Sequence, residues 1–72
     1  MVDTDKLKGL LVSKGFRQED AAKQIGISTP TLNGKINNKT DFLSSEIEQL
    51  CELLEIRDAK TVVEVFFSKN VN

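Results

Sequence analysis

The feature that most constrains this chain is a glycine that separates two short helical patterns within residues 18–38. Ala21, Ala22 and Ile25 fall on one face of a helix, and Gly26 then interrupts the pattern. Because glycine has no Cβ atom, it suits a turn in which the backbone reaches positive φ. Gly26 is therefore predicted to be the turn residue between two helices.

The second helical pattern follows directly, over residues 29–37. Ser28 and Thr29 are both good N-cap residues, and Pro30 suits the first turn of a helix. Leu32 and Ile36 are four residues apart and are predicted to form the buried face. Two helices joined by a short glycine turn form a helix-turn-helix.

Eight residues of this stretch match a known spacing, Q-x-x-x-A-x-x-(L/I)-G-(V/I)-S-x-x-x-(I/L)-x-x-x-x-N. They are Gln18, Ala22, Ile25, Gly26, Ile27, Ser28, Leu32 and Asn37. The stretch thus resembles the helix-turn-helix of the phage Cro/repressor family, often called XRE. The run from Leu32 to Asn37, followed by Phe42, looks like the small Cro-like proteins of temperate phages, especially those of Gram-positive hosts. The similarity extends from about Leu7 to about Leu54.

One departure from the family pattern concerns two predicted core positions. Many members carry an arginine where Leu11 stands and pair it with a glutamate where Ile36 stands. An apolar pair can replace such an ion pair without loss of stability, because neither charge has to be desolvated.

Three further helices are expected around the helix-turn-helix. The predicted fold is therefore all-α, a compact bundle of about five short helices, and the resemblance implies a lambda-repressor-like arrangement. Asp3 or Thr4 is expected to cap the first helix, and Ser45 with Glu48 forms a capping box at the start of the fourth. The predicted core positions are Leu7, Leu10 and Leu11 in the first helix and Ile47, Leu50, Cys51 and Leu54 in the fourth.

The segment 61–67, TVVEVFF, combines strong β propensity with helical spacing. A helix capped by Asp58 is favoured, and a strand that pairs between subunits is the alternative. The predicted inner stripe is Ala59, Val62, Val63, Phe66 and Phe67. Apolar residues in excess of what a small core absorbs suggest a dimer or partner interface at Val65, Phe66 and Phe67, and the alternative is that these are ordinary core residues.

Length and composition predict one small domain over residues 1–72, with loose ends at residues 1–3 and 69–72. The chain has neither a long apolar run nor a signal-peptide pattern, so we expect it in the cytoplasm, and the resemblance to phage proteins implies that of a bacterial host. Cys51 is the single cysteine, which excludes an internal disulfide, and histidine is absent. We therefore expect no metal, no cofactor and no enzymatic activity.

Charge is distributed unevenly along the chain. The net charge is −1, but residues 1–40 carry seven basic and four acidic residues, while residues 41–72 carry three and seven. No acidic residue occurs between Asp20 and Asp41. The predicted helix-turn-helix is therefore locally positive, whereas the whole chain is not basic enough to bind phosphates strongly.

The resemblance implies a surface for double-stranded DNA on the helix-turn-helix. The residues expected to face the bases are Thr29, Pro30, Asn33 and Gly34. The residues expected to contact phosphates are Gln18, Lys35, Asn37 and Lys39. Pro30 and Gly34 offer a base little or no hydrogen bonding, so sequence readout by this helix is expected to be sparse.

Two functions are consistent with these features. The resemblance implies a DNA-binding transcriptional regulator that acts as a dimer on a pseudo-palindromic operator, in a phage lysis–lysogeny switch. The acidic composition, the apolar tail, Pro30 and Gly34 favour an alternative, a modulator or antirepressor that binds a larger phage repressor. DNA binding would then be weak or shared with that partner.

Overall fold

The computed structural model describes residues 1–69, which form five α-helices and no strand. The helices are α1 (Thr4–Ser13), α2 (Gln18–Ile25), α3 (Thr29–Ile36), α4 (Ser44–Leu54) and α5 (Ala59–Phe66). The predicted compact all-α bundle of five short helices is confirmed. Apart from Lys69, which is exposed, the predicted loose end at residues 69–72 lies outside the described residues.

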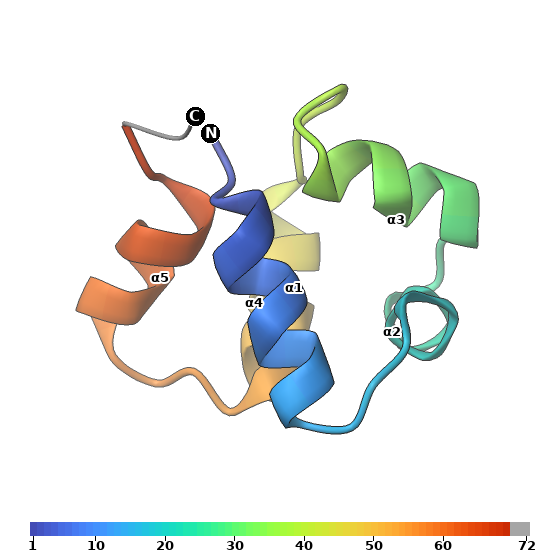
Figure 1. Cartoon of the computed structure of the whole chain (residues 1–72), viewed down its shortest axis with the longest axis horizontal. Coiled ribbons are helices and arrows are strands. Elements are labelled where there is room, and N and C mark those ends of the chain that lie inside the picture. Colours follow the sequence, from blue (N-terminus) through green and yellow to red (C-terminus); the bar gives the residue numbers. More distant parts are fainter. Residues whose placement is uncertain (70–72) are drawn as a thin grey trace.

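Helix α4 lies behind α1 in Figure 1 and contributes Leu50 and Leu54 to the core. In this view α5 lies on one side of α1, and the α2–α3 pair lies on the other side. The buried core residues come from all five helices and from the N-terminal segment: Val2, Leu7, Leu11, Ala21, Ala22, Ile25, Leu32, Ile36, Leu50, Leu54, Val65 and Phe66. No helix in the described part of the chain has the length and apolarity that a membrane crossing requires.

Three of the five helices begin at a side chain that caps them. Asp3, Ser28 and Asp58 each accept a hydrogen bond from the backbone N–H three residues later, at 2.9–3.2 Å. The predicted caps of α1, α3 and α5 are therefore confirmed. Of the two candidates each for α1 and α3, Asp3 and not Thr4 caps α1, and Ser28 and not Thr29 caps α3. The predicted capping box of α4 is wrong, because that helix begins two residues earlier than Ser45 and Glu48 require, with Leu43 as N-cap residue.

The register of α5 differs from the prediction. The segment is a helix, but Val63 and Phe67 are 53% and 54% exposed, whereas Val65 is completely buried. Phe66 is also buried, and its ring packs edge-on against Phe42 with a centroid distance of 5.7 Å. The predicted interface is therefore wrong for Val65 and Phe66, which belong to the core. Of the three predicted interface residues, Phe67 alone remains exposed.

The physical reason for this register is the position of the N-terminal segment. The N–H of Asp3 donates to the carbonyl of Val65 at 2.8 Å, which holds this side of α5 against the rest of the bundle. The predicted inner stripe relied on spacing within the helix alone. It is wrong for Ala59, Val63 and Phe67, all of which are exposed.

The N-terminal residues 1–3 are fixed to the bundle and are not the loose end that the sequence predicted. Val2 is buried, and its N–H and carbonyl both bond to the Asn38 side chain, at 2.7 and 2.9 Å. Met1 and Ser68 form a backbone pair, with bonds of 2.9 and 3.1 Å. The start of the chain therefore lies between the end of α5 and the loop after α3.

We predict that Asn38→Gly lowers the free energy of unfolding by about 1–2 kcal/mol, because it leaves both backbone groups of Val2 without their partner. Glycine retains the positive φ of 62° found at Asn38, so the variant tests the hydrogen bonds and not the backbone conformation. Urea unfolding measures the loss. Asn38→Ala should cost more than Asn38→Gly, because alanine adds strain at positive φ. Equal stability of wild type and Asn38→Gly would contradict this account.

Candidate nucleic-acid interface

The turn between α2 and α3 is closed by Gly26, as predicted. Gly26 has φ 77° and ψ 28°, in the left-handed region. The N–H of Ile27 donates to the carbonyl of Ala22 at 3.0 Å, which completes the end of α2. A Cβ atom built at Gly26 would meet nothing within 4 Å, so glycine is required here for its backbone conformation and not for space.

Helix α3 has a buried inner side and an exposed outer side. Leu32 and Ile36 are completely buried, as predicted. Of the four residues predicted to face bases, Thr29, Pro30 and Asn33 are exposed, and Gly34 is half-buried. Their spacing along the helix places them on one face.

A side-chain hydrogen bond joins this outer face to the start of α2. Nδ2 of Asn33 donates to Oε1 of Gln18 at 3.1 Å. Gln18 is the first residue of α2, where backbone N–H groups lack partners within the helix. A predicted base-facing residue and a predicted phosphate-contacting residue are thus brought together. With Oε1 occupied, the NH2 group of Gln18 retains its hydrogen-bonding capacity.

Lys35 does not lie where the sequence predicted. It is only 9% exposed, and its Nζ is 2.5 Å from Oε1 of Glu46, a residue of α4 that is also buried. The predicted phosphate contact by Lys35 is therefore wrong. The side chain leaves the outer face because a buried carboxylate at the start of α4 attracts it. Pairing compensates the cost of removing both charges from water.

The Glu46 carboxylate has a second role at the start of α4. Its Oε1 also accepts a hydrogen bond from the N–H of Leu43 at 2.8 Å. Burial alone would raise the pKa of Glu46, but the hydrogen bonds from Lys35 and Leu43 and the charge of Lys35 outweigh it. The pKa of Glu46 therefore lies below its ordinary value of 4.5.

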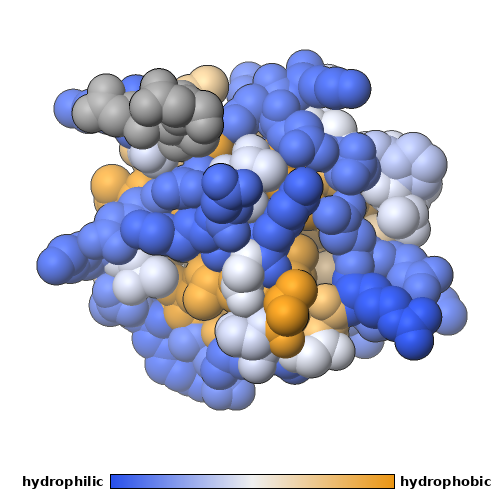
Figure 2. Space-filling view, in the orientation of Figure 1, coloured by the Kyte–Doolittle hydropathy of each residue, from blue (hydrophilic) through white to orange (hydrophobic). Residues whose placement is uncertain are grey.

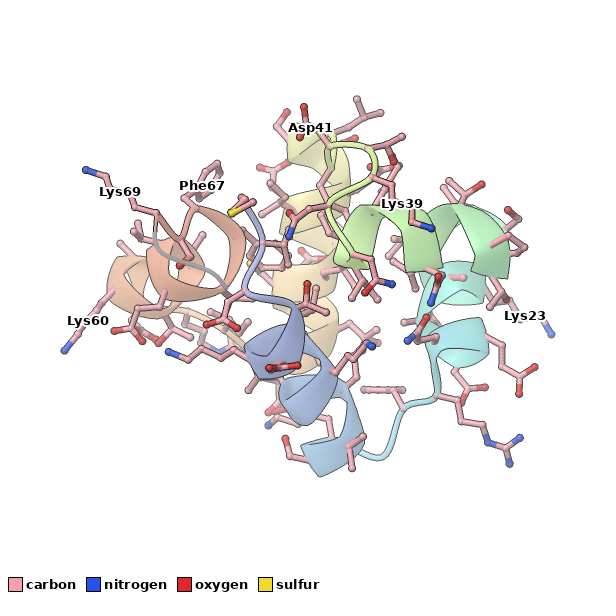
Figure 3. The ribbon with its side chains drawn as sticks, turned by 45° about the horizontal axis from the view of Figure 1, so that its top comes forward. Lys23, Lys39, Asp41, Lys60, Phe67 and Lys69 are labelled. Carbon is pink, nitrogen blue, oxygen red and sulfur yellow. The ribbon has the colours of Figure 1, made fainter. Side chains whose placement is uncertain are left out.

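The remaining predicted phosphate contacts lie at the end of α3. Nδ2 of Asn37 donates to the carbonyl of Asn33 at 2.9 Å, so this half-buried side chain is partly used to close the helix. Lys39 follows α3 and is exposed, and Lys23 is exposed on α2 (Figure 3). Neither lysine forms an ion pair with another residue of the described range 1–69.

Two exposed residues near this face were absent from the sequence prediction. Lys23 lies in the last turn of α2, and Thr31 lies in the first turn of α3, where its hydroxyl accepts a hydrogen bond from Ser28 at 2.7 Å. Both residues are polar and lie next to the predicted turn, which could have indicated that they are exposed near this face. Helical spacing alone assigned neither residue to it.

The described residues show no arrangement suited to metal binding or to thiol chemistry. Within residues 1–69 no group of three or more potential ligand side chains could hold a metal ion. Cys51 is half-buried, and burial raises the pKa of its thiol, which disfavours the reactive thiolate.

Comparison with known protein families gives a match over residues 1–69 to DUF739, a family described as a protein of unknown function. The chain belongs to the DUF739 family. The DUF739 match includes all five helices, so it covers the bundle and not the helix-turn-helix alone. No curated protein matches the chain.

We predict that Glu46→Gln lowers the free energy of unfolding at pH 7 by about 2 kcal/mol, because Lys35 loses its buried carboxylate partner. Since the folded pKa of Glu46 is below 4.5, its contribution is present above that pH and is lost as the pH falls through the folded pKa. Urea unfolding between neutral pH and acid should therefore show a weaker pH dependence in the variant.

The matched control is Glu48→Gln, on the exposed side of the same helix. This variant should retain both the stability of the wild type at pH 7 and its pH dependence. Equal effects of the two substitutions would show that the Lys35–Glu46 pair has no special role in stability.

Proposed function

We propose that this protein is a helix-turn-helix DNA-binding transcriptional regulator, with α3 as the helix that enters the major groove. The main support is the exposed outer face of α3, which is held from behind by Leu32 and Ile36 and tied to α2 through the Asn33–Gln18 bond. An α-helix presented in this way has the dimensions that the major groove admits.

The chemistry of the outer face suits a small number of base contacts. Asn33 retains Oδ1 and one N–H, the pair of groups that can bond the N6 and N7 positions of adenine. Thr29 offers a hydroxyl and a methyl group, and Pro30 offers only apolar contact to a thymine methyl. Gly34 adds no side chain, which allows the backbone to approach a partner closely.

The phosphate contacts would come from a few separate groups. The NH2 group of Gln18 and the N–H groups at the start of α2 form one donor site, and Lys23 and Lys39 add two positive charges. The charge of Lys35 is already neutralised by Glu46. Lys23 and Lys39 would therefore be the two lysines that neutralise phosphates. The logarithm of the binding constant should then fall with the logarithm of salt concentration with a slope of about −2 per chain.

The resemblance to the phage Cro/repressor family supports a role in a lysis–lysogeny switch, in which the protein would block a promoter by occupying it. A dimer on a pseudo-palindromic operator would place two α3 helices in successive major grooves, about one helical turn apart.

A second candidate function is a modulator or antirepressor that binds a larger phage repressor. The observation that favours it is the burial of Lys35, which removes one of the few positive charges from the helix-turn-helix of a chain with net charge −1. Such a surface would bind DNA weakly on its own.

We predict that selection from random duplexes enriches a defined sequence, and that Asn33→Ala weakens binding to it by about 10-fold or more, because the bidentate adenine contact is lost. Fluorescence anisotropy measures the affinity. The matched control is Gln49→Ala, which removes an exposed amide from α4 and should leave binding unchanged.

A second pair of variants tests the phosphate contacts. Lys39→Gln should weaken binding to every duplex and reduce the salt slope by about 1, while Lys60→Gln, at an exposed lysine of α5, should change neither (Figure 3). Equal weak affinity for all duplexes would contradict the proposal. Capture of a repressor encoded nearby, without DNA binding, would favour the second candidate.

A further inference from the structure

An exposed aromatic ring lies beside a hollow at the end of the molecule where the two termini meet. Phe67 follows α5 and is 54% exposed, although neighbouring Phe66 is buried. The hollow has a volume of about 280 Å³, and its lining includes the apolar side chains of Met1, Phe42 and Ile47 together with Phe66 and Phe67. Polar residues of the loop 38–41 also line the hollow. The exposed phenylalanine and the apolar part of the hollow are both unfavourable in water, so both favour contact with a partner.

We propose that this Phe67 surface, made of Phe67 and the adjoining hollow, joins two copies of the chain about a two-fold axis, with the Phe67 ring of each copy in the hollow of the other. A two-fold contact requires one surface to carry both complementary shapes, and here the ring and the hollow lie side by side. The space is sufficient for a ring, because an apolar cavity of about 150 Å³ already holds benzene.

Two charged side chains support the same arrangement. Asp41 lines the hollow, and Lys69 lies two residues beyond Phe67; Figure 3 shows them on opposite sides of the Phe67 ring. Neither forms an ion pair within the described residues of its own chain. When the ring of one copy enters the hollow of the other, its Lys69 approaches the Asp41 of that second copy. The two-fold axis produces this contact twice.

Other exposed apolar side chains do not offer this combination. Val12 and Val63 are exposed, but neither lines the hollow beside Phe67. A stable interface buries at least about 600 Å² per partner, roughly an eighth of the 4742 Å² surface of this chain. The contact centred on Phe67 is small, so the dimer should be weak and should dissociate on dilution.

This inference does not depend on DNA binding. Self-association is measured on the protein alone, whereas the proposed function is tested with DNA. Failure of either one can therefore be recognised separately.

The test is sedimentation equilibrium of the full chain from micromolar to millimolar concentration. The average mass of the wild type should rise with concentration from that of the 8.0 kDa monomer toward twice that value. Phe67→Asp should raise the dissociation constant at least about 10-fold, because it removes the central apolar side chain of the contact. Val63→Asp is the matched control, since Val63 lies on α5, one turn before Phe67, has nearly the same exposure, 53%, and should not affect the mass. Circular dichroism checks that both variants keep the fold.

Charge reversal tests the two-fold geometry. Asp41→Lys and Lys69→Asp should each weaken the dimer, and the two substitutions together in one chain should restore it, because each charge again meets its opposite across the axis. A wild-type chain that is monomeric at every concentration would overturn the proposal. Equal effects of Phe67→Asp and Val63→Asp, or no recovery in the double variant, would overturn it as well.

Discussion

The orientation of α3 depends on a buried ion pair between Lys35 and Glu46. Both side chains are nearly inaccessible to water, and their charges are separated by 2.5 Å. A buried charge that loses its partner is costly, so a rotation of α3 that exposed Lys35 would leave Glu46 uncompensated in the core. The pair therefore acts together with Leu32 and Ile36: the apolar residues hold the inner side of α3, and the ion pair sets which residues face outward.

The same interaction determines the electrostatics of the outer face. Lys23, Lys35 and Lys39 are the lysines between the acidic residues Asp20 and Asp41, and pairing with Glu46 neutralises one of the three. The surface that remains is polar and only weakly positive. Recognition by such a surface would depend on the shape of the helix and on the Asn33–Gln18 bond more than on attraction to phosphates.

The loop after α3 lies between this face and the hollow beside Phe67. Asn38 bonds to the backbone of Val2, while Lys39 is exposed beside α3 and Asp41 lines the hollow next to Phe67 (Figure 3). The two proposed surfaces are therefore adjacent in sequence but distinct in chemistry. One presents hydrogen-bonding groups on a helix, and the other presents an aromatic ring beside an apolar hollow. Figure 2 shows mainly polar side chains over the face viewed there, with apolar atoms exposed between α1 and α5.

The five short helices, the turn at Gly26, the Asp58 cap and the inner side of α3 could be predicted from the sequence alone, whereas two candidate caps each were left for α1 and α3. These features depend on residues within one turn of a helix of each other, where spacing and cap chemistry act directly. Long-range contacts fix three features that the sequence did not predict: the burial of Lys35, the side of α5 that faces the core, and the packing of the N-terminal residues against Asn38. Each of these depends on a partner more than ten residues away in the chain, and the local pattern carries no information about that partner.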